Sequence, residues 1–224
     1  MKSATAALLA LVLLVASAHG APEIARVNVH GQTLACCRVG SRHDPDAIGG
    51  YAGSSNFPRS VEGLVFGREG ELALVALPEE ETVPFEGRYL GMPLLLVNRT
   101  GEELSYPALD STLFLVLEGL DQEGRWRPVE STPETICGNS FHRVFLPAGQ
   151  YWEIVVPVYE GSFRTMLRYH LREGDVVSNV FEGTVNPEQF DPRTRGRTIA
   201  WSDVEGRFPA APTQREPAAS APPR

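Results

Sequence analysis

The chain has 224 residues and a formal net charge of −8, with 28 Asp and Glu against 20 Lys and Arg. An acidic balance argues against binding to nucleic acid or to anionic membrane surfaces, because both carry negative charge themselves. Gly and Pro are frequent, at 21 and 18 residues, which favours a turn-rich all-β protein over a helical one. The length suffices for one substantial domain.

The N-terminus has the layout of a secretory signal peptide. Lys2 gives a positive start, the run AALLALVLLV at residues 6–15 is apolar, and the small residues of ASAHG follow. This run is too short for a stable membrane anchor, and no later stretch is long and apolar enough for one. We therefore expect residues 1–20 to direct export to the periplasm or the cell exterior. Cleavage after Ala18 and cleavage after Gly20 both fit the preference for small residues.

Composition divides the remaining chain into four segments. Residues 21–60 are rich in Gly, Ser and Pro with little periodicity, so we expect an irregular N-terminal segment. Residues 61–190 hold almost all the apolar runs and should form the folded domain. Residues 191–207 form a C-terminal extension, and residues 208–224 are so rich in Pro and Ala that we expect a disordered tail.

The central segment reads as short strands separated by turn residues. Asn, Asp, Gly and Pro cluster between the apolar runs, as in Leu146-Pro147-Ala148-Gly149, which suits a type I turn. Such spacing favours a single antiparallel Ig-like β-sandwich. The predicted strands cover residues 64–66, 71–77, 90–97, 111–118, 125–130, 141–146, 150–158, 163–171 and 175–182.

The strand at residues 163–171 can be phased by its period of two. Phe163, Thr165, Leu167, Tyr169 and Leu171 share one face, which we expect to point into the core. The opposite face forms a basic stripe, for which two interpretations stand. It is a solvated surface whose arginines pair with nearby Glu, or it is a docking surface for an acidic partner. The residues of this stripe are Arg164, Arg168, His170 and Arg172.

Four stretches together resemble a known group of proteins. They are NRTGEEL, LDQEGRWRPVE, CGNSFHRVFLPAGQYWEIVVP and SNVFEGTVNPEQF, which span roughly residues 85–190. The chain is similar here to a group of exported bacterial Ig-like β-sandwich proteins whose functions are essentially uncharacterised. The resemblance implies the fold and export, and it carries over no catalytic residues.

Three cysteines follow the signal peptide: Cys36, Cys37 and Cys137. An exported protein favours oxidised thiols, and three thiols allow one internal bridge. Adjacent cysteines form a strained ring, so we predict a long-range disulfide of Cys137 with Cys37 or with Cys36. Two other interpretations stay open: free or intermolecular thiols, and a metal site, although the adjacent pair lacks the spacing of a zinc ribbon.

The stretch ETICGNSFH at residues 134–142 places Ser140 and His142 near Cys137. No Gly-x-Ser-x-Gly motif occurs, and a nucleophilic serine needs a base held by a third group. We interpret Gly138, Asn139 and Ser140 as a turn before a strand. An exported thiol beside two other cysteines is a poor catalytic nucleophile, because it tends to oxidise.

Two metal hypotheses remain. Cleavage after Ala18 would expose His19, whose amine and imidazole could bind copper together with a second histidine, as lytic polysaccharide monooxygenases and periplasmic copper carriers do. The second ligand stays open among His30, His43, His142 and His170. The HDPD sequence with Asp44 and Asp46 is too short of ligands for calcium, so we interpret it as a solvated turn.

Trp152 alternates with Ile154 and Val156 and should lie in the core, whereas Trp126 should be at least half exposed. The sequon Asn98-Arg99-Thr100 reads either as a glycosylation site or as a hairpin turn. The function that these observations favour is a non-catalytic binding module for a protein or glycan partner. The alternative is a copper-binding protein or copper-dependent oxidoreductase that uses His19.

Overall fold

The computed structural model describes residues 24–35, 37–80, 83–86, 89–132 and 138–194, and these form an all-β fold. The described residues contain no α-helix. Their helical turns are four short 3₁₀ segments: η1 (Pro78–Glu80), η2 (Gly138–Ser140), η3 (Pro187–Phe190) and η4 (Pro192–Thr194). The predicted signal peptide and C-terminal tail lie outside the described residues.

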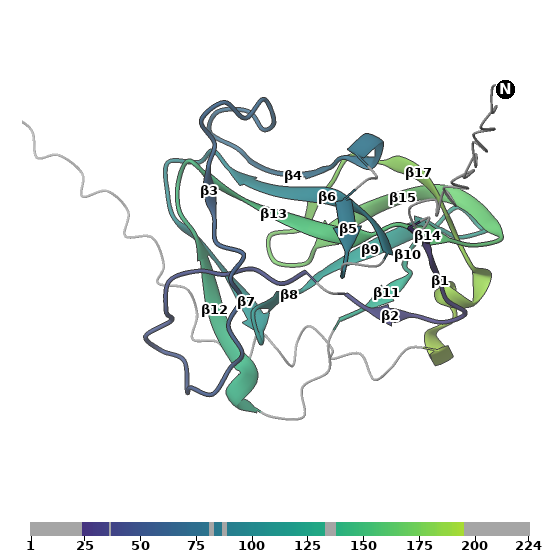
Figure 1. Ribbon diagram of the computed structural model, residues 1–224, viewed down its shortest axis with the longest axis horizontal. Coiled ribbons are helices and arrows are strands. Elements are labelled where there is room, and N and C mark those ends of the chain that lie inside the picture. The colour runs from purple at the N-terminus through teal and green to yellow at the C-terminus, as the bar shows by residue number, and fades with distance from the viewer. Residues whose placement is uncertain (1–23, 36, 81–82, 87–88, 133–137, 195–224) are drawn as a thin grey trace, which may run out of the picture.

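The first large sheet is antiparallel and has five strands. All of β13 pairs with β6 residues 91–98, with Trp152 opposite Leu96. Figure 1 shows β4, β6 and β13 side by side across the upper part of the molecule. The order is β3 (Arg59–Ser60), β13 (Gln150–Pro157), β6 (Tyr89–Asn98) and β4 (Leu72–Ala76), with β5 (Val83–Phe85) also on β6.

Two antiparallel sheets form the opposite side of the sandwich. One has the order β10 (Trp126–Pro128), β9 (Leu115–Leu120), β15 (Phe163–Leu171) and β16 (Val176–Val177), with β17 (Phe181–Val185) also on β15. The other has the order β12 (Phe141–Leu146), β7 (Leu104–Leu109) and β8 (Thr112–Leu113).

The core lies between these layers and confirms the phase predicted for β15. Leu167, Tyr169 and Leu171 are buried, and they alternate with side chains that are more exposed. Trp152 is also buried, and its indole nitrogen donates to the Gly40 carbonyl oxygen at 2.8 Å. The sequence therefore places the core faces of these two strands correctly.

The N-terminal segment is irregular as expected, and its described residues pack on the sandwich. It contributes two short parallel pairs, which depart from a wholly antiparallel pattern. These are β1 (Val27–Asn28) with β14 (Tyr159–Glu160), and β2 (Thr33–Leu34) with β11 (Glu130–Ser131). Cys37 and Val39 of the same segment lie in the core.

The strands expected at residues 141–146 and 163–171 have the observed bounds, but other predictions need correction. Residues 64–66 form no strand. The run at residues 111–118 begins with a turn, because Asp110 and Ser111 adopt positive φ angles of 47° and 64°. It is then interrupted at Phe114, between β8 and β9. The run at residues 175–182 divides into β16 and β17.

Strand β7 was missed because Pro107 lies within it. Proline cannot donate to a strand ladder, so it argues against a strand in the sequence. In the structure β8 pairs only with Ala108 and Leu109, while Pro107 is opposite Arg143 of β12 on the other side. The missing donor is tolerated because Pro107 lies beyond the end of the short strand β8.

Candidate functional site

The basic stripe lies on the outer face of β15, and acidic side chains meet each of its members. Arg164 forms an ion pair with Glu182 of β17. The other three surround Glu118 of β9, with N–O distances of 2.9 Å for Arg168, 3.0 Å for His170 and 3.8 Å for Arg172.

Glu118 is the centre of this network. Burial pushes the pKa of its carboxyl upward, but hydrogen bonds from His170 and Arg168 outweigh burial, and the net pKa is lowered. The second ring nitrogen of His170 lies 2.7 Å from Asp175. The Arg168 guanidinium also stacks 4.3 Å above the ring of the half-buried Trp126, as expected for a semi-exposed tryptophan.

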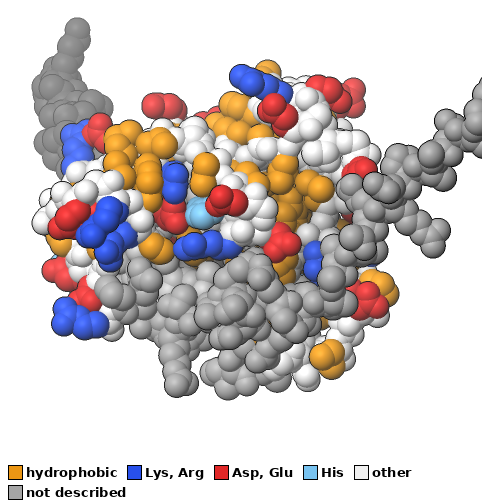
Figure 2. All heavy atoms as spheres, turned by 180° about the vertical axis from the view of Figure 1, so that it is seen from behind, with side chains coloured by type: hydrophobic (Ala, Val, Ile, Leu, Met, Phe, Trp, Pro, Cys, Tyr) orange, Lys and Arg blue, Asp and Glu red, His pale blue; other side chains and the backbone are white. Residues whose placement is uncertain are grey.

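These contacts match the interpretation of the stripe as a surface in which arginines pair with nearby Glu. Figure 2 shows basic and acidic side chains interspersed on the face that it presents, rather than a field of one sign. Whether the stripe docks a partner stays a prediction.

In the described part of the ETICGNSFH stretch, residues 138–142, the chain forms the turn that the sequence indicates. Gly138–Ser140 make η2, and β12 begins at Phe141. Cys37 is buried at 1% exposure in the core. Cys36 and Cys137 lie outside the described residues, so the disulfide also stays a prediction.

His142 contacts a serine that the sequence did not indicate. Its Nε2 lies 3.3 Å from the hydroxyl of Ser111, while its Nδ1 lies 3.2 Å from the backbone oxygen of Ser140. The imidazole is stacked on Tyr51 with ring centroids 3.7 Å apart. The sequence contains no sign of this contact, because Ser111 lies in the turn between β7 and β8, 31 positions before His142.

The Ser111–His142 pair is built as a structural contact. Burial lowers the pKa of His142 despite the opposing contact with Ser140. The Ser111 hydroxyl donates to the Ala52 carbonyl oxygen at 2.9 Å. Ser111 and His142 are both buried. A nucleophile must be reachable by substrate, so these bonds fasten the loop around Ala52 rather than form a catalytic dyad.

The two metal hypotheses have different outcomes. Asp44 is buried rather than solvated, and it accepts bonds from the backbone nitrogens of Asp46 and Arg143 at 3.1 and 2.7 Å. In the described part of the chain, no group of three or more His, Cys, Asp and Glu side chains could hold a metal ion. His19 lies outside that part, so the copper hypothesis stays a prediction.

The sequon forms a hairpin turn. The Asn98 amide nitrogen is buried and donates to the backbone oxygens of Glu102, Leu146 and Pro147 at 2.8, 3.0 and 3.1 Å. Its oxygen accepts from the Thr100 hydroxyl at 2.6 Å. A side chain held in this way is inaccessible to a glycosylating enzyme while the protein is folded.

A cavity of about 550 Å³ opens where the N-terminal segment crosses the sandwich; we call it the outer cavity. Pockets that hold small molecules measure about 300–1,000 Å³. The walls are mainly apolar and come from β1, β2, β5, β6, β13 and β14. They include Val27, Leu34, Phe85, Tyr89, Pro157 and Tyr159.

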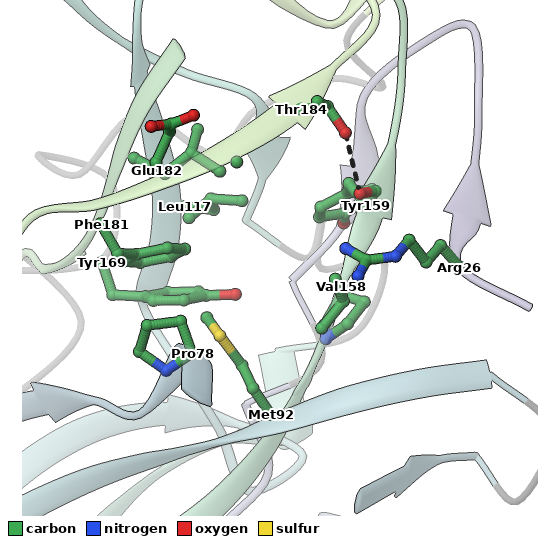
Figure 3. Close-up of a pocket in the computed structure, with 13 residues that line it drawn as sticks. Arg26, Pro78, Met92, Leu117, Val158, Tyr159, Tyr169, Phe181, Glu182 and Thr184 are labelled. Atoms are coloured by element: carbon green, nitrogen blue, oxygen red, sulfur yellow. Dashed lines mark hydrogen bonds between the residues drawn. The ribbon is translucent and has the colours of Figure 1, made fainter. Parts of the chain in front are cut away.

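A second cavity of about 30 Å³, which we call the inner cavity, adjoins it between the layers. Arg26, Pro157 and Tyr159 line both cavities. Figure 3 shows the hydroxyl of Tyr169 pointing into the inner cavity, toward Met92.

A buried carboxyl group lies behind Tyr159. Glu130 accepts from the Tyr159 hydroxyl at 2.7 Å and from the Leu117 backbone nitrogen at 3.0 Å. Burial raises the pKa of Glu130, and these two bonds oppose the rise without reversing it. Burial also raises the pKa of Tyr169, and the nearby Glu130 adds to the rise, so the phenol stays neutral.

Sequence reasoning placed Tyr169 in the core but missed the cavities. Alternation along β15 was the available signal for Tyr169. Nothing in the local pattern brings Arg26 and Leu34 to Tyr159, because these positions are more than one hundred residues apart and meet through the parallel pairs.

Within the described residues, no helix has the length and apolar character needed to cross a membrane. No protein-family model, no curated protein and no solved structure matches this chain. The candidate site therefore rests on its own geometry.

Proposed function

We propose that this protein is an exported, non-catalytic binding module that takes a small ligand into the outer cavity. The single observation that carries the proposal is the cavity itself, at about 550 Å³ with mainly apolar walls. Such a hollow with a few polar groups at its margin is the usual form of a small-molecule site. The part of the proposal that concerns export rests on the signal-peptide pattern of residues 1–20.

The cavity supports a binding role better than the basic stripe does. The arginines of the stripe already contact Glu118 and Glu182, so a partner would have to replace existing ion pairs. The outer cavity offers unfilled apolar surface instead, and burying such surface is the main favourable contribution to ligand binding. This reasoning favours a small ligand over the protein or glycan partner expected from the sequence.

The proposal can be tested by filling the cavity. Leu34 lines it and is 53% exposed, so a Leu34→Trp substitution should occupy the cavity without disturbing the core. Val65→Trp is the matched control, since Val65 is 86% exposed and lies outside the cavity. The full chain would be produced with its own leader in its native host, and small molecules extracted from the purified protein would be identified by mass spectrometry.

We expect the wild type and Val65→Trp to carry the same compound in near-stoichiometric amount, and Leu34→Trp to lose it. Equal amounts in all three proteins, or no compound in any of them, would count against a ligand in the outer cavity.

A further inference from the structure

The hydroxyl of Tyr169 is a buried polar group without a hydrogen-bond partner among the described residues. The side chain is 0% exposed, and its oxygen is one of five such atoms. A buried donor left without a partner destabilises the folded state, because it has lost its hydrogen bonds to water. Among those five atoms, it is the one whose residue lines the inner cavity, and Figure 3 shows it aimed into that space.

The shape of the two cavities restricts what could meet this hydroxyl. The inner cavity of about 30 Å³ accepts only a group of one or a few atoms, while the outer cavity of about 550 Å³ accepts a larger body. Both cavities have Arg26, Pro157 and Tyr159 in their walls, so they are neighbours. A ligand whose slim end passes between these side chains would place its body outside and its end inside.

The chemistry at the Tyr169 end of the inner cavity favours an uncharged group. The walls there include Met92, Leu117 and Phe181, so a charged group beside the Tyr169 hydroxyl would lose hydration among apolar side chains. Arg26 lies across the cavity, next to Tyr159, where the two cavities share their walls (Figure 3). Two polar side chains of the inner cavity are already engaged: Thr184 with the Tyr159 backbone oxygen, and Glu182 with Arg164.

We propose that the ligand is a neutral amphiphile with a slim apolar body and one terminal hydroxyl or carbonyl oxygen. The apolar body lies in the outer cavity, and the oxygen hydrogen-bonds with the Tyr169 hydroxyl in the inner one. This inference rests on the proposed function, and it adds the ligand class and the residue that recognises it.

The test uses three probes of equal chain length: 1-octanol, octanoate and octylammonium. Each would be titrated calorimetrically into the wild type, Tyr169→Phe, Leu34→Trp and Val65→Trp. Tyr169→Phe removes only an unpartnered hydroxyl, so the fold is expected to be retained, and circular dichroism would verify it.

We expect 1-octanol to bind the wild type and Val65→Trp most tightly of the three probes. Its affinity should fall about 2–10-fold in Tyr169→Phe, which corresponds to the loss of one ordinary hydrogen bond. Leu34→Trp should abolish binding of all three probes. A crystal structure of the 1-octanol complex should place the ligand oxygen within hydrogen-bond distance of Tyr169.

Three results would overturn the inference. Tighter binding of octanoate or octylammonium would reject a neutral end and leave the proposed function standing. Equal affinity of the wild type and Tyr169→Phe for 1-octanol, or an ordered water alone on Tyr169, would reject its role. Binding of any probe that Leu34→Trp leaves unchanged would place the ligand elsewhere and reject the proposed function as well.

Discussion

The outer face of β15 and the core region behind Tyr159 each bury one acidic side chain, and the pKa values of the two acids shift in opposite directions. At the outer face, Arg168 and His170 hydrogen-bond with the buried carboxylate of Glu118, and its pKa is lowered. In the core region, Glu130 of β11 accepts hydrogen bonds from the Tyr159 phenol and the Leu117 backbone amide, and its pKa is raised. Among the described residues, no cation is paired with Glu130.

The opposite pKa shifts of Glu118 and Glu130 show that burial alone does not decide the direction of the shift. Burial is the largest influence on both groups and pushes both pKa values upward. Hydrogen bonds from Arg168 and His170 reverse that effect at Glu118, whereas those from the Tyr159 phenol and the Leu117 amide do not reverse it at Glu130. The outer face therefore behaves as a stabilising network, while the core region behind Tyr159 holds an acid that ionises less readily.

The largest expected effect comes from Glu118→Gln. This change leaves the partly buried Arg168 guanidinium without its carboxylate partner, and it leaves His170 with Asp175 alone, so the free energy of unfolding should fall by about 3 kcal/mol. Urea denaturation at neutral pH measures it. Glu130→Gln is the matched control, and its change should be below about 1 kcal/mol, because Tyr159 can accept from the new amide while donating to Thr33. Equal losses at the two positions would contradict the comparison.

A second comparison uses Tyr159 and Tyr169, the two buried tyrosines that line the inner cavity. Tyr159→Phe removes a donor to Glu130 and should lower the free energy of unfolding by about 1–3 kcal/mol. Tyr169→Phe should leave it nearly unchanged or raise it, because the lost hydroxyl has no partner among the described residues. Thermal and urea unfolding of both variants measure the difference. A greater loss in Tyr169→Phe would show that its hydroxyl is satisfied in the apo protein.

The dependence of stability on pH should have opposite signs for the two acids. Glu118 has a folded-state pKa below its ordinary 4.5, so its stabilisation is present above pH 4.5 and is lost as the pH falls through the folded-state pKa. Glu130 has a folded-state pKa above 4.5, so its stabilisation is present below pH 4.5 and is lost as the pH rises through the folded-state pKa.

Unfolding free energies of the wild type and both Gln variants, measured from about pH 3 to pH 7, separate the two contributions. The difference between wild type and Glu118→Gln should shrink toward acid, and the difference between wild type and Glu130→Gln should change in the opposite direction. If both differences changed with pH in the same direction, the opposite pKa shifts of Glu118 and Glu130 would be contradicted.

The smallest expected effect is at the exposed end of the stripe. Arg164 pairs with Glu182, and both side chains are mostly exposed, so solvent screens their attraction. Arg164→Ala should change the free energy of unfolding by less than about 0.5 kcal/mol. A loss as large as that of Glu118→Gln would show that the whole stripe acts as one network.

Local patterns were informative wherever one residue's environment depended on its neighbours in the chain. Alternation placed Tyr169 and Trp152 in the core, and turn residues located η2 and the hairpin at Asn98. Local patterns were misleading where a residue distant in the chain determined the environment. Pro107 argued against strand β7, which nevertheless forms between β8 and β12. Asp44 was expected in a solvated turn, but it is buried and accepts a hydrogen bond from the backbone of Arg143.

The sequence by itself determined the all-β class, the inward and outward faces of β15 and the irregular character of the N-terminal segment, since these follow from periods of two and from turn chemistry. Only the tertiary structure decided that this segment packs on the sandwich and that Ser111 rather than the Ser140 hydroxyl meets His142. It also decided that the pKa of Glu118 is lowered while that of Glu130 is raised. The physical reason is that contacts between distant segments set burial and hydrogen-bond partners, and these are not encoded in any local pattern of residues.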